Sequence, residues 1–137
     1  MADYREHRES ILPGSAPGEQ QTFGLQLVAE FFRRASWDVW LEFPSSTDEL
    51  LDIIAHQSFS VVRLSVGAET RLDGLVARVK MVRRASRNKS LGIVLGGRAV
   101  TEHPESVGLV GADASAGDGR QAPTIAERLV RVLGFTH

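Results

Sequence analysis

The chain has 137 residues, of which 42% are hydrophobic and 24% charged, the balance of an ordinary globular protein with one domain. It contains no cysteine, which excludes a disulfide framework, a thiolate metal site and a cysteine nucleophile. Its net charge of -1 argues against binding of polyanions over the whole surface. The apolar runs fall far short of the roughly 20 residues of a transmembrane helix, and residues 1–10 lack the apolar core of a secretory signal. We therefore expect a soluble, cytoplasmic protein without membrane contact.

Short strand-like segments alternate with segments of helical periodicity along the chain. A flexible segment, 1–8, is expected to precede a single domain, 9–137. The first strand is expected at 8–13 and a Pro/Gly-rich loop at 13–18, because proline lacks the N–H that a strand ladder uses. The other strands are expected at 37–43, 59–66, 91–95 and 110–114. Helices are expected at 22–35, from Ser46 onward, at 69–87, at 101–107 and at 122–133, the last with Gly134 as its C′ cap.

This alternation predicts a flavodoxin-like, doubly wound α/β fold. Its five-stranded parallel sheet has the order 2-1-3-4-5, with helices on both faces. The strand at 59–66 is expected to be buried on both faces, which makes Arg63 unusual. Burial of a guanidinium is costly unless it lies at the end of a strand or meets an acid. Ligands of such sheets bind beyond the carboxyl ends of the strands, so the loops there are the candidate site.

The loop after the first expected strand contains Glu19, Gln21 and Gly24, the third strand ends at Ser65 and Gly67, and the fourth ends at Gly96 and Gly97. This pattern resembles the cobalamin (vitamin B12)-binding domain of methionine synthase, methylmalonyl-CoA mutase and related bacterial sensors. The family pattern is Asp-x-His-x-x-Gly, then Ser-x-Leu, then Gly-Gly, and the resemblance covers roughly residues 8–133. In that family the nucleotide tail of the cofactor is buried along the domain, and the histidine replaces it as the lower ligand of cobalt. The resemblance implies a cofactor site at Glu19, Gln21, Gly24, Ser65, Gly67, Gly96 and Gly97.

Two of these positions depart from the family pattern. Gln21 stands in place of the histidine, and an amide oxygen is a poor ligand for cobalt or iron. Gly67 stands in place of the leucine. Three alternatives remain: cobalamin bound without a protein ligand from this loop, another flat macrocycle such as heme, or no ligand. Heme is included because relatives that resemble the photosynthesis antirepressors of purple bacteria use it in this fold.

His103 is the candidate axial metal ligand, because it follows the Gly-Gly pair on the side where a macrocycle would lie. An exposed histidine at the start of a helix is the alternative. Six cations without an intervening acid lie in the segment 78–89, which we call the basic segment. They form either a solvated helix end or a docking surface for an acidic partner. No aromatic residue interleaves with them, which argues against direct binding of nucleic acid.

No catalytic motif is present: the chain lacks a nucleophile elbow, a Walker loop, a His-Glu-x-x-His helix and a dinucleotide fingerprint. The sequence therefore predicts a non-catalytic domain of the cobalamin-binding type. It would sense a tetrapyrrole, light or redox state and signal to a partner protein such as a transcriptional regulator. The alternatives are a corrinoid carrier subunit of a methyltransferase or mutase, and a degenerate domain used only for protein contacts.

Overall fold

The fold is described by a computed structural model of the chain. It covers residues 10–15, 22–39, 46–66, 72–97, 100, 102–116 and 120–134. The strands are β1 (Ser10–Ser15), β2 (Asp38–Val39), β3 (Val61–Ser65), β4 (Gly92–Gly96) and β5 (Ala114–Ser115). The helices are α2 (Thr22–Arg34), α3 (Thr47–His56), α4 (Leu72–Ala85), α6 (Ser106–Val110) and α7 (Ala122–Gly134).

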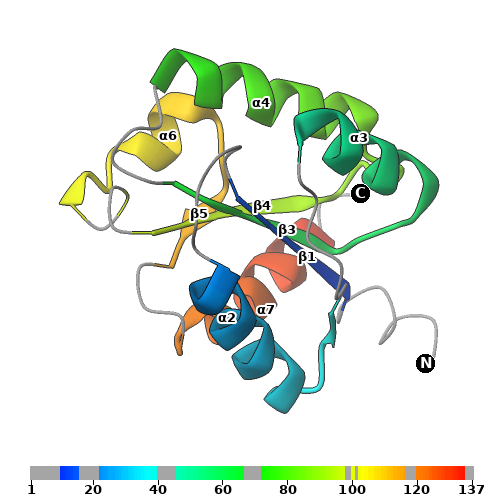
Figure 1. The fold of residues 1–137 in the computed structure, drawn as a ribbon, viewed down its shortest axis with the longest axis vertical. Helices are drawn as coiled ribbons and strands as arrows, with labels where there is room; N and C mark the ends of the chain where they lie inside the picture. Colours follow the sequence, from blue (N-terminus) through cyan, green and yellow to red (C-terminus); the bar gives the residue numbers. More distant parts are fainter. Residues whose placement is uncertain are drawn as a thin grey trace.

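The five strands form one parallel sheet in the order β2-β1-β3-β4-β5, which confirms the predicted topology. Helices α3, α4 and α6 cover one face of the sheet, and α2 and α7 cover the other (Figure 1). Because side chains alternate along a strand, β3 contributes to both cores. Val62 and Leu64 pack with the α3–α4–α6 side, and Val61 packs with the α2–α7 side. All three are at most 1% exposed, as expected for a strand buried on both faces.

The α2–α7 core contains Phe32 of α2 and Trp37, which follows that helix. Their rings meet edge to face with centroids 5.2 Å apart, a favourable aromatic geometry. Both side chains are buried, at 1% and 5% exposure. Trp37 thus packs on α2. The chain reaches this position through Ser36, whose φ of 70° is unusual for a residue other than glycine.

Several predicted boundaries were wrong by a few residues. Strand β1 continues through Pro13 and Gly14 to Ser15, where we expected a loop. Among the described residues, β2 pairs only with Ser10 and Ile11, so the rest of β1 pairs with β3 alone. That part of β1 resembles an edge strand, where proline is tolerated. Of the second strand expected at 37–43, β2 covers Asp38–Val39, and residues 40–43 lie outside the described part.

The last third of the chain also differs from the prediction. Helix α6 begins at Ser106, after Pro104 rather than around it, since a residue that precedes proline is disfavoured in helical conformation. It extends through Val110, which we placed in a strand, and Gly111 ends it in the left-handed conformation with φ of 83°. Strand β5 therefore starts only at Ala114. Gly134 is the last residue of α7 rather than its C′ cap, a difference of one residue.

Helix α3 begins at the cap that its sequence predicts. The Ser46 side chain accepts a hydrogen bond from the backbone N–H of Glu49 at 3.1 Å. We expect Ser46→Ala to lower the free energy of unfolding by about 1 kcal/mol, because that N–H loses its acceptor. Urea denaturation followed by circular dichroism would measure the change. Ser46→Asp restores an acceptor and should retain the stability, so an equal loss in both variants would contradict the role of the cap.

Candidate functional site

The candidate site is the edge of the sheet where the central strands end. Ser15 of β1 is in register with Ser65 of β3, and Ser65 is in register with Gly96 of β4. The backbone N–H of Val66 donates to the carbonyl oxygen of Gly96 at 2.7 Å, which holds the two strand ends together. Three residues predicted from the sequence, Ser65, Gly96 and Gly97, therefore lie side by side. The loops after β3 and β4 start at this edge, on the left of Figure 1.

The other predicted cofactor residues are only partly covered by the structure. Glu19, Gln21 and Gly67 lie outside the described residues. Gly24 lies in the first turn of α2. The role of these four residues stays a prediction.

Gly97 makes a turn that requires glycine. Its φ of 108° lies in a region that side chains rarely adopt. A Cβ atom built on Gly97 would lie 3.1 Å from the Val66 nitrogen and closer still to the Val66 carbonyl oxygen. Because Gly97 has no side chain, the backbone of Val66 can pack against it. This contact fixes the direction in which the chain leaves β4.

Gly96 lacks a side chain for a different reason. The guanidinium of Arg63, from the neighbouring strand, packs directly on its α-carbon: a Cβ at Gly96 would lie 2.5 Å from Arg63 Cζ and 2.8 Å from Arg63 Nε. Arg63 is only 5% exposed, and burial lowers the pKa of its guanidinium to about 10. The side chain therefore stays charged at neutral pH. The sequence identified Arg63 as unusual but not as part of the site; a charged residue two positions before Ser65 was the available signal.

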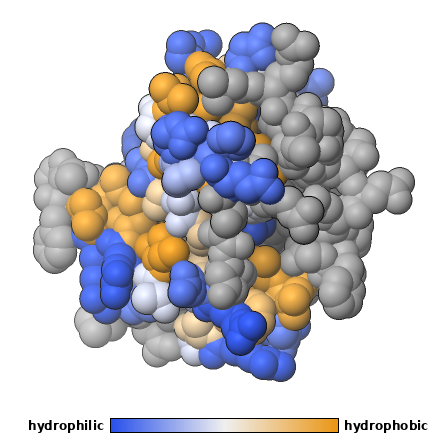
Figure 2. Space-filling model, turned by 90° about the vertical axis from the view of Figure 1, so that its left-hand side faces the viewer, coloured by the Kyte–Doolittle hydropathy of each residue, from blue (hydrophilic) through white to orange (hydrophobic). Residues whose placement is uncertain are grey.

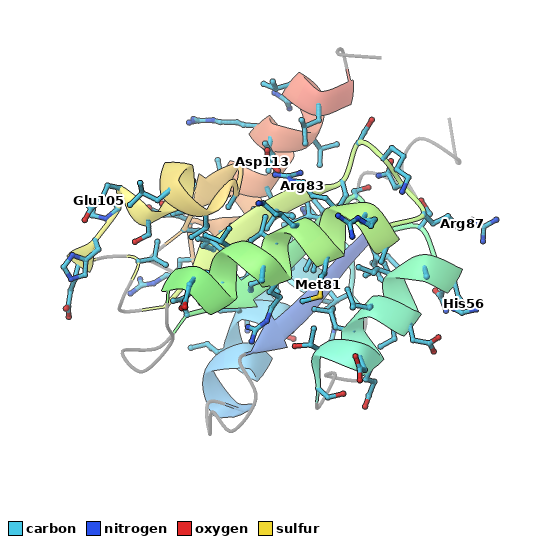
Figure 3. The ribbon with its side chains drawn as sticks, turned by 90° about the horizontal axis from the view of Figure 1, so that it is seen from above. His56, Met81, Arg83, Arg87, Glu105 and Asp113 are labelled. Carbon is cyan, nitrogen blue, oxygen red and sulfur yellow. The ribbon has the colours of Figure 1, made fainter. Side chains whose placement is uncertain are left out.

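His103, the candidate metal ligand, is exposed. Its Nδ1 lies 3.5 Å from a carboxylate oxygen of Glu105, and both side chains are more than 60% exposed, at 66% and 63%. Among the residues that the structure describes, no group of three histidine, aspartate or glutamate side chains is placed to hold a metal ion. The assignment of His103 as an axial ligand stays a prediction. Figure 3 shows Glu105 at one end of the molecule, far from the labelled side chains of α3 and α4.

The basic segment is partly explained by bonds within the protein. Arg83 of α4 donates to the carbonyl oxygen of Gly111 at 2.7 Å and to the carboxylate of Asp113 at 2.9 Å. Figure 3 shows the Arg83 and Asp113 side chains close together. Arg87 donates to the His56 carbonyl at 3.1 Å, and Lys89 donates to the Arg84 carbonyl at 2.9 Å. These three cations join and cap elements of the fold, so their presence does not require an acidic partner.

Asp113 is a structural residue that the sequence did not reveal. One of its carboxylate oxygens accepts from the backbone N–H of Ile93 at 2.8 Å, and its own N–H donates to the Ile93 carbonyl at 2.9 Å. The side chain thus takes the place of a backbone carbonyl where β5 begins to pair with β4. This local mimicry depends on a contact twenty residues apart in the sequence, so no short motif predicts it.

The surface around the strand ends combines hydrophobic and hydrophilic residues (Figure 2). Figure 2 views the molecule from the left of Figure 1, and over its described part hydrophobic residues form separate patches among hydrophilic ones. No helix of the described residues is both long and apolar enough to cross a membrane.

The parallel five-stranded sheet in the order β2-β1-β3-β4-β5, with helices on both faces, defines a flavodoxin-like α/β protein. The chain belongs to the B12-binding domain family, whose match covers residues 9–126. This confirms the resemblance found in the sequence. A search of the curated proteins gave no match.

Solved structures similar to this chain include proteins of different kinds. A cobalamin-binding protein from Desulfitobacterium hafniense DCB-2 matches with a TM-score of 0.76 and 19% identity over 90% of this chain and 60% of that chain. The monomethylamine corrinoid protein of Methanosarcina barkeri matches with a TM-score of 0.74 and 16% identity over 93% and 62%. A sensor protein from Polaromonas sp. JS666 matches with a TM-score of 0.68 and 17% identity over 92% and 98%. The chain thus spans about three-fifths of the first two proteins. At these identities the similarity establishes the fold.

The described residues fit a corrinoid only in part. The resemblance implies that Gly96 and Gly97 belong to the cofactor site and that the nucleotide tail of cobalamin is buried along the domain. Ser65, Gly96 and Gly97 lie in one row at the carboxyl ends of β3 and β4. The α-carbon of Gly96, however, is covered by the Arg63 guanidinium. A nucleotide tail does not fit against Gly96 while Arg63 holds that position.

Proposed function

We propose that this chain is a non-catalytic regulatory domain that binds a tetrapyrrole, with a corrinoid as the first candidate, and signals to a partner protein. The observation that carries the proposal is membership of the B12-binding domain family over residues 9–126. A corrinoid supplies a flat macrocycle with a central cobalt ion. The loops at the carboxyl ends of β1, β3 and β4 are the part of the fold that would bind it.

The residue at position 21 favours a regulatory domain over a methyl-group carrier. A carrier would need a side chain that ligates the cobalt, and an imidazole nitrogen would do this better than an amide oxygen. Gln21 lacks that nitrogen. Binding by a domain with glutamine at this position depends on contacts to the macrocycle itself, and such binding suits detection of the ligand.

The test is retention of a chromophore. The purified protein is incubated with hydroxocobalamin or, separately, with hemin, passed through a gel-filtration column, and its absorption spectrum is recorded. We expect the cobalamin spectrum to elute with the protein. A Soret band with hemin that is lost in His103→Ala would instead identify heme as the ligand and His103 as its axial residue. Failure to retain either chromophore would overturn the proposed ligand binding.

The same assay tests the position of residue 21. Gln21→His should strengthen retention of cobalamin about tenfold or more, since even the outer-shell partners of metal ligands alter affinity by that factor. Gln57→His is the matched control. Gln57 is exposed at the C-terminal end of α3, which leads into the amino end of β3 and not into its carboxyl end. Equal retention by both variants and the wild type would place residue 21 away from the macrocycle.

A further inference from the structure

Arg63 lies in the middle of the sheet, on the side covered by α2 and α7. Its neighbours across the ladders are Pro13 on β1 and Val94 on β4. Val61, two residues before it on β3, packs in the α2–α7 core together with Val94. The guanidinium extends from the level of Val94 to the level of Gly96, that is, toward the carboxyl edge.

The two glycines of β4 show how this side of the sheet is filled. A Cβ at Gly92 would lie 2.7 Å from Leu129 Cδ2 and 3.3 Å from Leu133 Cδ1, so α7 packs on Gly92. Gly96 lies four residues further along the same face. There the Arg63 guanidinium, and not a side chain of α7, packs on the glycine. Each glycine thus makes room for a side chain of this protein. The guanidinium acts as the packing group at the carboxyl end of the face.

We propose that Arg63 closes the space beside Gly96 to the nucleotide tail of a corrinoid, so that this chain selects tetrapyrroles by the ring and not by the tail. The inference rests on the proposed function and names the ligand class of the same site. Two observations support it: the guanidinium is in contact with the Gly96 α-carbon, and the Arg63 side chain is almost completely buried. Recognition of the tail phosphate by Arg63 is the competing outcome, and it requires the guanidinium to be reached from outside.

The experiment compares a corrinoid that carries the nucleotide tail with one that lacks it. Hydroxocobalamin carries the nucleotide, and diaquocobinamide lacks it. Absorbance titrations give the dissociation constants for the wild type, Arg63→Ala, Arg63→Met and Arg34→Ala. Arg63→Ala removes the filling group, whereas Arg63→Met keeps an unbranched side chain of similar reach without the charge. Arg34 is an exposed arginine of α2 and serves as the control. Circular dichroism verifies that each variant is folded.

We expect the wild type, Arg63→Met and Arg34→Ala to bind the two corrinoids with equal affinity. Arg63→Ala should bind cobalamin at least about tenfold more tightly than cobinamide, because the tail gains a buried contact that raises the affinity by about that factor. A preference for cobalamin in the wild type, lost in both Arg63 variants, would overturn exclusion and establish phosphate recognition. Equal binding by Arg63→Ala would overturn the proposal as well.

A second measurement separates this inference from the proposed function. The free nucleoside α-ribazole carries the tail base without the ring, and its binding is observed by saturation-transfer NMR. Binding of α-ribazole to Arg63→Ala, but not to the wild type or Arg63→Met, supports the inference. This holds even when no corrinoid binds the wild type, because that result would contradict only the proposed function. Absence of α-ribazole binding to all variants, together with absence of corrinoid binding, overturns both proposals.

Discussion

Replacement of Gly97 by alanine is expected to lower the free energy of unfolding by about 3 kcal/mol, because a strained backbone conformation and a close backbone contact act together. The φ of 108° disfavours any residue with a side chain, and the new Cβ would press on the Val66 carbonyl oxygen. Backbone atoms of a strand end cannot yield as a flexible side chain can. Urea denaturation, followed by the fluorescence of the tryptophans and by circular dichroism, measures the loss.

Gly96→Ala is the matched variant for this prediction. Its new Cβ meets the Arg63 guanidinium, the far end of a flexible side chain, so the expected loss is smaller, about 2 kcal/mol. In an Arg63→Ala background the loss at Gly96 should shrink by about 1 kcal/mol or more, since contacting residues are coupled. The loss at Gly97 should stay unchanged in that background. Rescue of Gly97→Ala by Arg63→Ala, or a lack of rescue at Gly96, would contradict the packing described here.

Asp113→Ala is expected to lower the free energy of unfolding by about 3 kcal/mol, because it leaves a buried N–H without its acceptor. That N–H belongs to Ile93, which is 0% exposed in the centre of the sheet. The same substitution removes the carboxylate that Arg83 contacts at 2.9 Å. The pairing of β5 with β4 and the attachment of α4 to this corner then weaken together. Hydrogen exchange of the Ile93 amide, measured by NMR, should become faster. The rate should rise by the same factor as the equilibrium constant for the opening that exposes this amide.

Asp113→Asn is the control, since its amide oxygen still accepts from Ile93. Only the charge facing Arg83 is lost, and that pair is partly exposed, with side chains 21% and 38% exposed. The expected loss is therefore about 1 kcal/mol. Equal losses for the alanine and asparagine variants would mean that the ion pair, and not the bond to Ile93, fixes this corner.

The places of the candidate site residues in the fold could be predicted where they depend on local sequence, and their role toward a cofactor stays a prediction. Ser65, Gly96 and Gly97 occupy strand ends, and strand ends follow from hydrophobic pattern and glycine placement. The roles of Arg63 and Asp113 could not be predicted, because each depends on a partner from another strand. The resemblance implied that Gly96 belongs to a cofactor site, so the space beside it was open to a ligand. In the fold that space is used by Arg63, which a linear pattern does not reveal.

The sequence by itself determined the alternation of strands and helices, the order of the sheet, the family and the absence of thiol chemistry. These follow from periodicity, turn residues and composition, which are properties of neighbouring residues. Only the tertiary structure decided which side chains fill the face beside Gly96, how β5 is joined to β4, and how Arg83, Arg87 and Lys89 of the basic segment bond within the molecule. The physical reason is that packing and hydrogen bonding between strands join residues distant in the chain, and their geometry exists only once the sheet has formed.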